Sequence, residues 1–283
     1  MPEDVDDPRH IIDILLEERC EKMQASPLWP FYKWVLFPIL RHREAVRMAD
    51  DITDKNGPDA LTHVSDLLKL NITTENLETM PKTGRVIIAS THPTGIADGI
   101  AMYDALKARR GDIMIFANRD AIRAAPQLRE VIIPVEWLQE KRTRQRSRET
   151  LVETKKAFEA EKCVVIFPSG RLAFMKDRVL TEQDWMSSVV NLARKYKCDV
   201  IPVHMKARNS WLYYWFRNLG KEMRDITLFN ELLNKKKQPF HLTFGDRISH
   251  EALNGDPELV TKALQRHAVE DVVAGKPWTS LED

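Results

Sequence analysis

A histidine and an aspartate, His92 and Asp98, stand six positions apart in the segment Ser-Thr-His-Pro-Thr-Gly-Ile-Ala-Asp-Gly. The segment follows an apolar run that predicts a strand and precedes a pattern that predicts a helix. Pro93 and Gly95 favour a tight turn that folds His92 back towards Asp98. A carboxylate beside one imidazole nitrogen sets the tautomer and steadies the cation that forms when the other nitrogen takes a proton. The pair predicts a general base, and a purely structural turn is the alternative.

A second candidate segment, Val-Val-Ile-Phe-Pro-Ser-Gly-Arg, ends at Arg171 and again begins as a buried strand. Gly170 lets the backbone approach a ligand, and the guanidinium of Arg171 can bind a phosphate in bidentate fashion. Ser169 completes a Pro-Ser-Gly sequence that is equally common in ordinary turns. Two further strand ends carry cations, at Arg119 and at Arg208. These segments predict that an anionic ligand binds where the strands end.

Short apolar runs alternate with helical patterns from about residue 80 onwards, which predicts an α/β domain with a mostly parallel or mixed central sheet flanked by helices. The expected strands are 86–89, 113–116, 131–135, 164–167, 200–203 and 241–244, and the expected helices are 97–109, 144–160, 183–197 and 257–274. The first 80 residues predict helices, at 8–25, 41–53 and 59–70, so we expect a helical N-terminal extension (1–80) before the α/β domain (81–283).

The most apolar stretch, residues 28–40 (LWPFYKWVLFPIL), is rich in aromatic residues. As a helix it would be roughly 20 Å long, too short for a hydrocarbon core of about 30 Å. Tryptophan and tyrosine favour the membrane interface, so the stretch predicts either peripheral membrane contact or packing on the protein core. Residues 211–216 (WLYYWF) leave the same choice, between a lipid-facing role and helix packing. The basic residues at 141–148 predict a solvated helix face or a contact with anionic groups.

Composition excludes several classes of protein. The net charge is +1, from 43 Lys and Arg against 42 Asp and Glu, which argues against nucleic-acid binding and against disorder. The three cysteines are far apart, so neither a disulfide framework nor a metal site is expected, and Cys163 is expected to be a buried small residue. The acidic N-terminus lacks a secretory pattern, so we expect a cytoplasmic protein.

Four segments together resemble the sequence blocks of the glycerolipid (lysophospholipid, PlsC-like) acyltransferases. They are His92–Asp98, Arg119, Phe167–Arg171, and Val200–Val203 with Arg208–Ser210. The resemblance covers about residues 80–210 and is greatest to the bacterial hemolysin-like branch, which includes acyltransferases of ornithine-lipid synthesis. It implies transfer of a fatty acyl group from acyl-CoA or acyl carrier protein, with no other cofactor, to a hydroxyl of a glycerol phosphate or lysolipid.

The resemblance also implies roles for residues. His92 would be the base and Asp98 its partner, while Arg119, Ser169, Gly170 and Arg171 would surround the acceptor phosphate. We further expect backbone N–H groups near Gly95 to stabilise the oxyanion. Two features differ from most of the family: five residues, not four, separate His92 from Asp98, and Ser169 replaces a glutamate. The enzyme would lie peripherally on the inner face of the membrane, with membrane lipids as partners.

A second class of function remains open, a lipid-binding or membrane-tethering protein that keeps this fold without turnover. An α/β-hydrolase-like enzyme is disfavoured because no Gly-x-Ser-x-Gly sequence is present. The sequence leaves open whether the acceptor is glycerol 3-phosphate, lysophosphatidic acid or a lyso-ornithine lipid. It also leaves the acyl chain length and the oligomeric state open.

Overall fold

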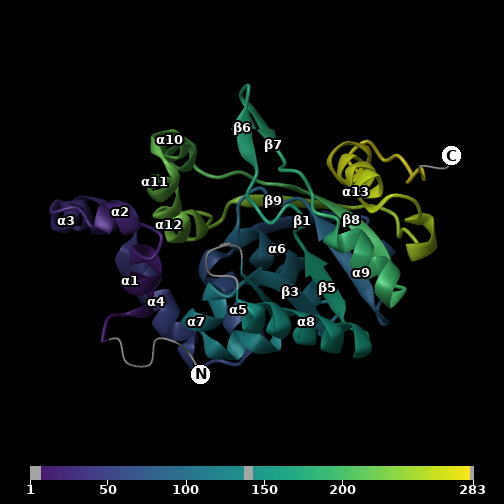
Figure 1. The fold of residues 1–283 in the computed structure, drawn as a ribbon, viewed down its shortest axis with the longest axis horizontal. Helices are drawn as coiled ribbons and strands as arrows, with labels where there is room; N and C mark the ends of the chain where they lie inside the picture. The colour runs from purple at the N-terminus through teal and green to yellow at the C-terminus, as the bar shows by residue number, and fades with distance from the viewer. Residues whose placement is uncertain (1–7, 137–142, 281–283) are drawn as a thin grey trace. The chain divides into compact units, whose positions relative to one another are not determined.

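The computed structural model describes residues 8–136 and 143–280, and its chain divides into two compact units (Figure 1). The first unit comprises residues up to Leu70, Arg119–Glu130 and Asn209–Gln238. The second comprises Asn71–Asn118, Val131–Arg208 and the chain from Pro239 onwards.

The described part of the first unit is helical. Its helices are α1 (Ile11–Glu17), α2 (Glu21–Gln24), α3 (Trp29–Ile39), α4 (His42–Thr53), α5 (Gly57–Leu68), α7 (Asp120–Ala124), the 3₁₀-helix η2 (Pro126–Glu130), α10 (Trp211–Leu219), α11 (Lys221–Asp225) and α12 (Leu228–Leu233). Local signals set these bounds: the Asn56 side chain accepts a hydrogen bond from the Asp59 N–H at the start of α5. No helix in the described ranges combines the length and apolarity needed to cross a membrane.

The second unit is built on a seven-stranded sheet in the order β1-β9-β8-β2-β5-β3-β4. Its strands are β1 (Asn71–Glu75), β2 (Val86–Ser90), β3 (Ile113–Asn118), β4 (Ile132–Val135), β5 (Cys163–Ile166), β8 (Asp199–Lys206) and β9 (Pro239–Phe244). All neighbouring pairs are parallel except β8 and β9, which are antiparallel. The predicted mostly parallel or mixed α/β sheet is therefore confirmed.

Helices cover both faces of this sheet. On one face, α8 (Arg144–Glu159), α9 (Ser188–Tyr196) and α13 (Pro257–Arg266) share a core with the side chains of Ile87 and Ala89. The helix α6 (Ile96–Lys107) connects β2 to β3 in the direction opposite to the α8 and α9 connections. Because such crossovers are right-handed, α6 lies on the other face. Strand β2 thus has both faces covered and reads as a continuous apolar run.

The remaining elements are short. The 3₁₀-helices η1 (Leu77–Thr79) and η4 (His250–Ala252) flank strands, and α13 continues into the π-helical turn η5 (His267–Asp271). An antiparallel hairpin, β6 (Phe174–Lys176) and β7 (Val179–Thr181), forms a separate two-stranded sheet that projects from the unit (Figure 1). The sequence patterns did not predict this hairpin, because its strands are too short to show periodicity.

The structure divides the chain differently from the predicted boundary at residue 80. Residues 71–75, expected in a helical region, form β1 and pair with β9. This strand is largely exposed and has a single large apolar residue, Ile72, so it lacks the alternation that marks a strand in sequence. Two later segments also join the first helical unit through contacts distant in sequence.

Candidate active site

The loop from β2 to α6 carries the predicted His92 and Asp98 and is fixed to the neighbouring strand β8. The Thr91 N–H donates to the Val203 carbonyl at 3.1 Å, and the Met205 N–H donates to the Thr91 hydroxyl at 2.8 Å. These bonds extend the sheet pairing past the end of β2. The main chain at His92 is therefore held at a defined position at the carboxyl edge of the sheet, where α/β proteins bind ligands.

The side chains of His92 and Asp98 form a hydrogen bond, as the sequence predicted. His92 Nδ1 lies 2.9 Å from Asp98 Oδ2, and the His92 side chain is 16% exposed while that of Asp98 is fully buried. Because an ionised carboxylate can only accept a hydrogen bond, His92 Nδ1 carries the proton of the neutral ring. Nε2 is then the basic nitrogen. This is the arrangement that a histidine general base needs.

Asp98 accepts hydrogen bonds from Thr94 and Gly95 in addition to the one from His92. Its Oδ2 also accepts the N–H groups of Thr94 at 2.8 Å and Gly95 at 2.9 Å, and its Oδ1 accepts the Thr94 hydroxyl. Asp98 lies in the first turn of α6, where the helix dipole favours a negative charge. These donors compensate a carboxylate that has no contact with solvent.

Gly95 has a different role from the one expected. Its φ of 100° is a conformation that side chains rarely adopt, and a Cβ there would lie 3.1 Å from a Leu172 methyl group. The tight turn lets its N–H donate to Asp98. The expectation that this N–H stabilises an oxyanion is therefore corrected: Gly95 serves the His92–Asp98 pair.

Phe167 adds a contact that the sequence reasoning missed. It directly follows β5, the neighbour of β2, and its ring stacks on the His92 ring with centroids 4.4 Å apart and planes 24° apart. Phe167 was recognised only as part of a block. Strand order, which places β5 beside β2, is what brings the two rings together.

Glu182 is a second residue that the sequence reasoning missed. Its Oε2 accepts the His92 N–H at 3.1 Å, and its Oε1 accepts the indole N–H of Trp185 at 3.2 Å. Burial raises the pKa of Glu182, and the hydrogen bond from His92 opposes that rise. Glu182 lies outside all four sequence blocks, so no motif could have indicated it.

The third block forms the turn after β5. Ser169 is buried, and its hydroxyl donates to the Arg171 carbonyl at 2.8 Å. Gly170 has a φ of 57°, and Arg171 is exposed. Arg171 thus lies in the turn that follows β5, the strand next to β2, and its predicted contact with an acceptor stays a prediction. Arg119 precedes α7 in the first unit, so its predicted contact with an acceptor stays a prediction.

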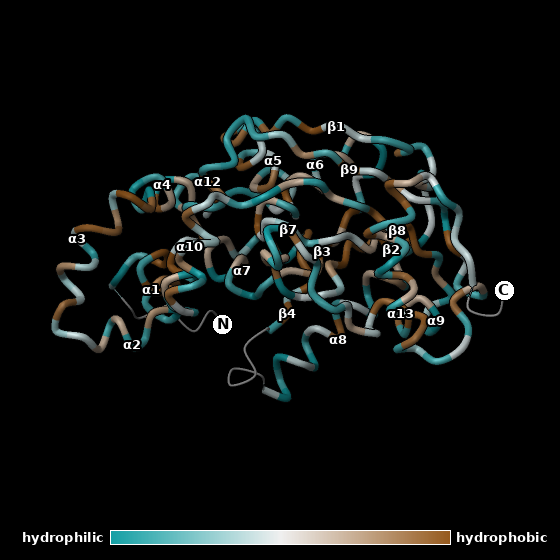
Figure 2. The backbone as a smooth tube through the Cα atoms, turned by 90° about the horizontal axis from the view of Figure 1, so that it is seen from above, coloured by the Kyte–Doolittle hydropathy of each residue, from teal (hydrophilic) through white to brown (hydrophobic). Residues whose placement is uncertain are grey.

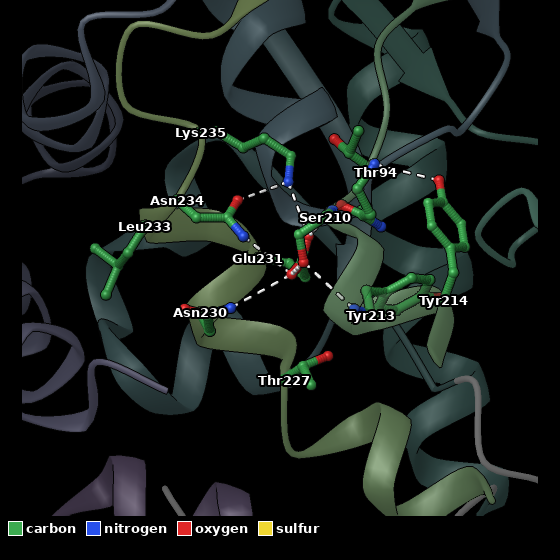
Figure 3. Close-up of polar contacts among 12 residues, drawn as sticks. Thr94, Ser210, Tyr213, Tyr214, Thr227, Asn230, Glu231, Leu233, Asn234 and Lys235 are labelled. Atoms are coloured by element: carbon green, nitrogen blue, oxygen red, sulfur yellow. Dashed lines mark hydrogen bonds and ion pairs between the residues drawn. The ribbon is translucent and has the colours of Figure 1, made fainter. Parts of the chain in front are cut away.

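The end of the fourth block is built into a buried polar cluster of the first unit (Figure 3). Ser210 precedes α10, and its N–H donates to Glu231 Oε2 at 2.8 Å. The same oxygen lies 3.0 Å from Lys235 Nζ, and both charged side chains are almost fully buried. Asn234 donates to the other carboxylate oxygen at 3.0 Å. This cluster fastens the start of α10 to α12.

The environment of Cys163 makes its thiol a poor nucleophile. Cys163 is completely buried on β5, as expected, and burial raises the pKa of its thiol to about 12.

The basic segment 141–148 is described only from residue 143, so Lys141 and Arg142 lie outside the described residues. Within it, Arg146 pairs with Glu136 at 3.0 Å.

Comparison with known proteins is consistent with this site. Residues 71–206, which contain the His92 loop and the third block, match the family model "Acyltransferase". The chain is 25% identical over 279 residues to a lyso-glycine lipid O-acyltransferase of Phocaeicola vulgatus, covering 95% of this chain and 96% of that protein. It is 23% identical over 276 residues to a protein of the same name from Bacteroides thetaiotaomicron, covering 95% and 98%.

A solved structure is also similar, that of the 1-acyl-sn-glycerophosphate acyltransferase PlsC from Thermotoga maritima. The TM-score is 0.48 and the identity 16%, over 93% of this chain and 96% of that one. The family model and the curated relatives confirm the resemblance of the four sequence blocks to the PlsC-like glycerolipid acyltransferases.

Proposed function

We propose that this protein is a lipid O-acyltransferase in which His92, oriented by Asp98, is the general base. The observation that carries the proposal is the 2.9 Å hydrogen bond between His92 Nδ1 and the fully buried Asp98. That bond leaves Nε2 as the basic nitrogen at the carboxyl edge of the sheet. The match of residues 71–206 to the acyltransferase family model supports the reaction class, acyl transfer.

The reaction needs no covalent enzyme intermediate. His92 Nε2 takes the proton of the acceptor hydroxyl while the hydroxyl oxygen attacks the thioester carbonyl carbon. The resulting oxyanion is stabilised at the N-terminal turn of α6, which begins at Ile96. When the carbon–sulfur bond breaks, the protonated His92 returns its proton to the leaving thiolate. The donor is acyl-CoA or acyl carrier protein, and no other cofactor takes part.

The acceptor is a lysolipid with a free hydroxyl and an anionic headgroup. The two curated relatives are named for action on a lyso-glycine lipid. A carboxylate and a phosphate are both bound in bidentate fashion by arginine. The exposed Arg171 and the turn at Ser169 and Gly170 would bind this headgroup, with Arg119 as a further candidate.

The enzyme works peripherally at a membrane. In the first unit, apolar side chains of α3 are exposed, including Phe31 at 57% and Trp34 at 75%, and hydrophobic stretches run along this helix (Figure 2). Trp211 on α10 is 72% exposed. Exposed tryptophan is typical of a membrane interface. The cytoplasmic, inner-face location stays a prediction from the sequence.

Two experiments test these assignments. In the first, purified protein receives acyl-CoA and a lyso-glycine lipid, and free thiol is measured. We expect His92→Ala to lower kcat by about 10²–10⁴-fold, while His241→Ala on β9 leaves it unchanged. Wild-type activity of a folded His92→Ala protein would overturn the base assignment. Vesicle binding by a wild-type protein with no acceptor-dependent thiol release would favour the tethering alternative.

In the second, co-sedimentation with anionic phospholipid vesicles compares Trp34→Glu and Trp211→Glu with Leu259→Glu. Leu259 is a comparably exposed apolar residue of α13, at 56%. We expect weaker binding only for the tryptophan variants. Equal binding by all three variants would contradict the membrane contact.

A further inference from the structure

We propose that Glu182 is a positioning residue for His92, holding its main chain so that Nε2 points at the acceptor. The inference rests on the proposed base role of His92. It assigns a function to a residue outside the sequence blocks that define the family resemblance.

The carboxylate of Glu182 bridges two donors. Oε2 accepts the main-chain N–H of His92 at 3.1 Å, and Oε1 accepts the indole N–H of Trp185 at 3.2 Å. Trp185 is buried, so its indole is a fixed support. The bridge therefore links the His92 main chain to the core beneath α9 and α13.

The chain on both sides of Glu182 is fixed, by strand β7 before it and by contacts with α13 after it. Glu182 directly follows β7, and the residues after it are tied to α13: the Trp185 N–H donates to the Gln265 side chain at 3.0 Å, and Gln265 donates to the Gln183 carbonyl at 3.0 Å. These bonds leave the Glu182 backbone little freedom. A side chain on such a support can fix the position of its partner.

Residues at the two ends of the β6–β7 hairpin hydrogen-bond to the main chain of His92. Ala173, just before β6, donates its N–H to the His92 carbonyl at 2.9 Å, and Glu182, just after β7, accepts the His92 N–H. The ring is held separately, by Asp98 at Nδ1 and by Phe167 across its face. The main chain and the ring of His92 are thus fixed by independent contacts, which leave the direction of Nε2 defined.

The charge of Glu182 also matches the reaction. When His92 takes the acceptor proton it becomes a cation, and the nearby Glu182 carboxylate attracts that cation. Burial of the carboxyl works against its ionisation, and the hydrogen bonds from His92 and Trp185 favour it. A neutral isostere at this position would keep an acceptor for the His92 N–H and lose the attraction.

The test compares Glu182→Ala, Glu182→Gln and Asp184→Asn in the full-length protein, by steady-state acyl transfer. Asp184 is exposed two positions away, so its variant is a matched loss of charge. We expect Glu182→Ala to lower kcat by about 10–100-fold with the acceptor KM changed by less than about twofold. Glu182→Gln should recover part of this loss, and Asp184→Asn should match wild type. Thermal unfolding establishes that each variant is folded.

A folded Glu182→Ala protein with wild-type kcat would overturn the inference, as would a loss found only in KM. If Glu182→Ala does not fold, Glu182→Met decides, because it fills a similar volume and offers the His92 N–H no oxygen acceptor: a kcat equal to that of Asp184→Asn would overturn the inference. His92→Ala, measured in parallel, separates the two proposals. If His92→Ala is inactive and the Glu182 variants are fully active, only the proposed role of Glu182 is wrong. If His92→Ala is active, the assignment of His92 as the base is wrong as well.

Discussion

The rings of His92 and Phe167 lie nearly parallel, 24° apart, with their centroids separated by 4.4 Å. The two residues come from the ends of adjacent parallel strands, β2 and β5. Phe167 thus shields one face of the imidazole and restricts its rotation. In the proposed function, the orientation of His92 therefore depends on the Phe167 ring as well as on the Asp98 carboxylate.

Phe167→Leu should therefore lower kcat without unfolding the protein, because leucine fills much of the volume and offers no flat surface to the ring. We expect a loss of about tenfold, well below that of His92→Ala. Kinetic assays with acyl-CoA and a lyso-glycine lipid measure it, and Phe116→Leu, a partly buried residue of β3 packed against the core, is the control. An unchanged kcat in the Phe167 variant would show that stacking does not orient the base.

Asp98→Asn should reduce kcat by about 10³–10⁴-fold, since a carboxamide group cannot accept from all of the surrounding donors and no longer fixes the His92 tautomer. Its NH₂ group would face a donor at Thr94, Gly95 or His92. Asp66→Asn, on the exposed side of α5, is the charge-matched control. Retention of more than a tenth of wild-type kcat by a folded Asp98→Asn protein would contradict the partner role.

Glu182 should make stability depend on pH in a defined direction. Burial raises its pKa from an ordinary value of 4.5, so the folded state holds this proton more tightly than the unfolded state does. The stability linked to that proton is full below pH 4.5 and is lost as pH rises through the raised pKa. Glu182→Gln is neutral throughout, so its free energy of unfolding should improve relative to wild type as pH rises from 4 to 7.

Urea denaturation at several pH values measures that difference. Because the other titrating groups are shared by both proteins, their effects largely cancel. Asp184→Asn should show no comparable trend. A difference that is constant across the range, or that moves in the other direction, would contradict the role of burial at Glu182.

Breaking the buried Glu231–Lys235 pair should destabilise the first unit. Both side chains are nearly inaccessible, so Lys235→Met leaves a buried carboxylate without its cation, at a cost of about 3–5 kcal/mol. Lys155→Met, which breaks the exposed pair with Glu159 on α8, should cost less than about 1 kcal/mol. Chemical denaturation measures both. Equal losses in the two variants would show that burial does not set the cost.

The three cysteines should be unreactive in the folded protein. Cys20, Cys163 and Cys198 are buried, and burial raises the pKa of each thiol to about 12. Little thiolate is present at pH 8, so alkylating reagents should leave acyl transfer unchanged. All three thiols should react after unfolding in urea. Rapid loss of activity on alkylation of the native protein would refute this.

Part of the site follows from neighbouring residues alone. His92 and Asp98 meet within one loop, because Gly95 allows the turn and the first turn of α6 presents Asp98 to its own N-terminal N–H groups. The apolar runs of β2 and β5 mark them as buried strands. Such contacts span few residues, so the local sequence carries enough information to predict them.

The rest depends on which strands become neighbours. Phe167 reaches His92 only because β5 pairs with β2, and Thr91 is fixed by β8, more than a hundred residues later in the chain. Glu182 reaches the His92 N–H through a hairpin whose short strands leave no periodic pattern. The sequence by itself, through its resemblance to known acyltransferases, indicated the reaction class and paired His92 with Asp98. Only the tertiary structure, through contacts between residues distant in sequence, decided how His92 is held.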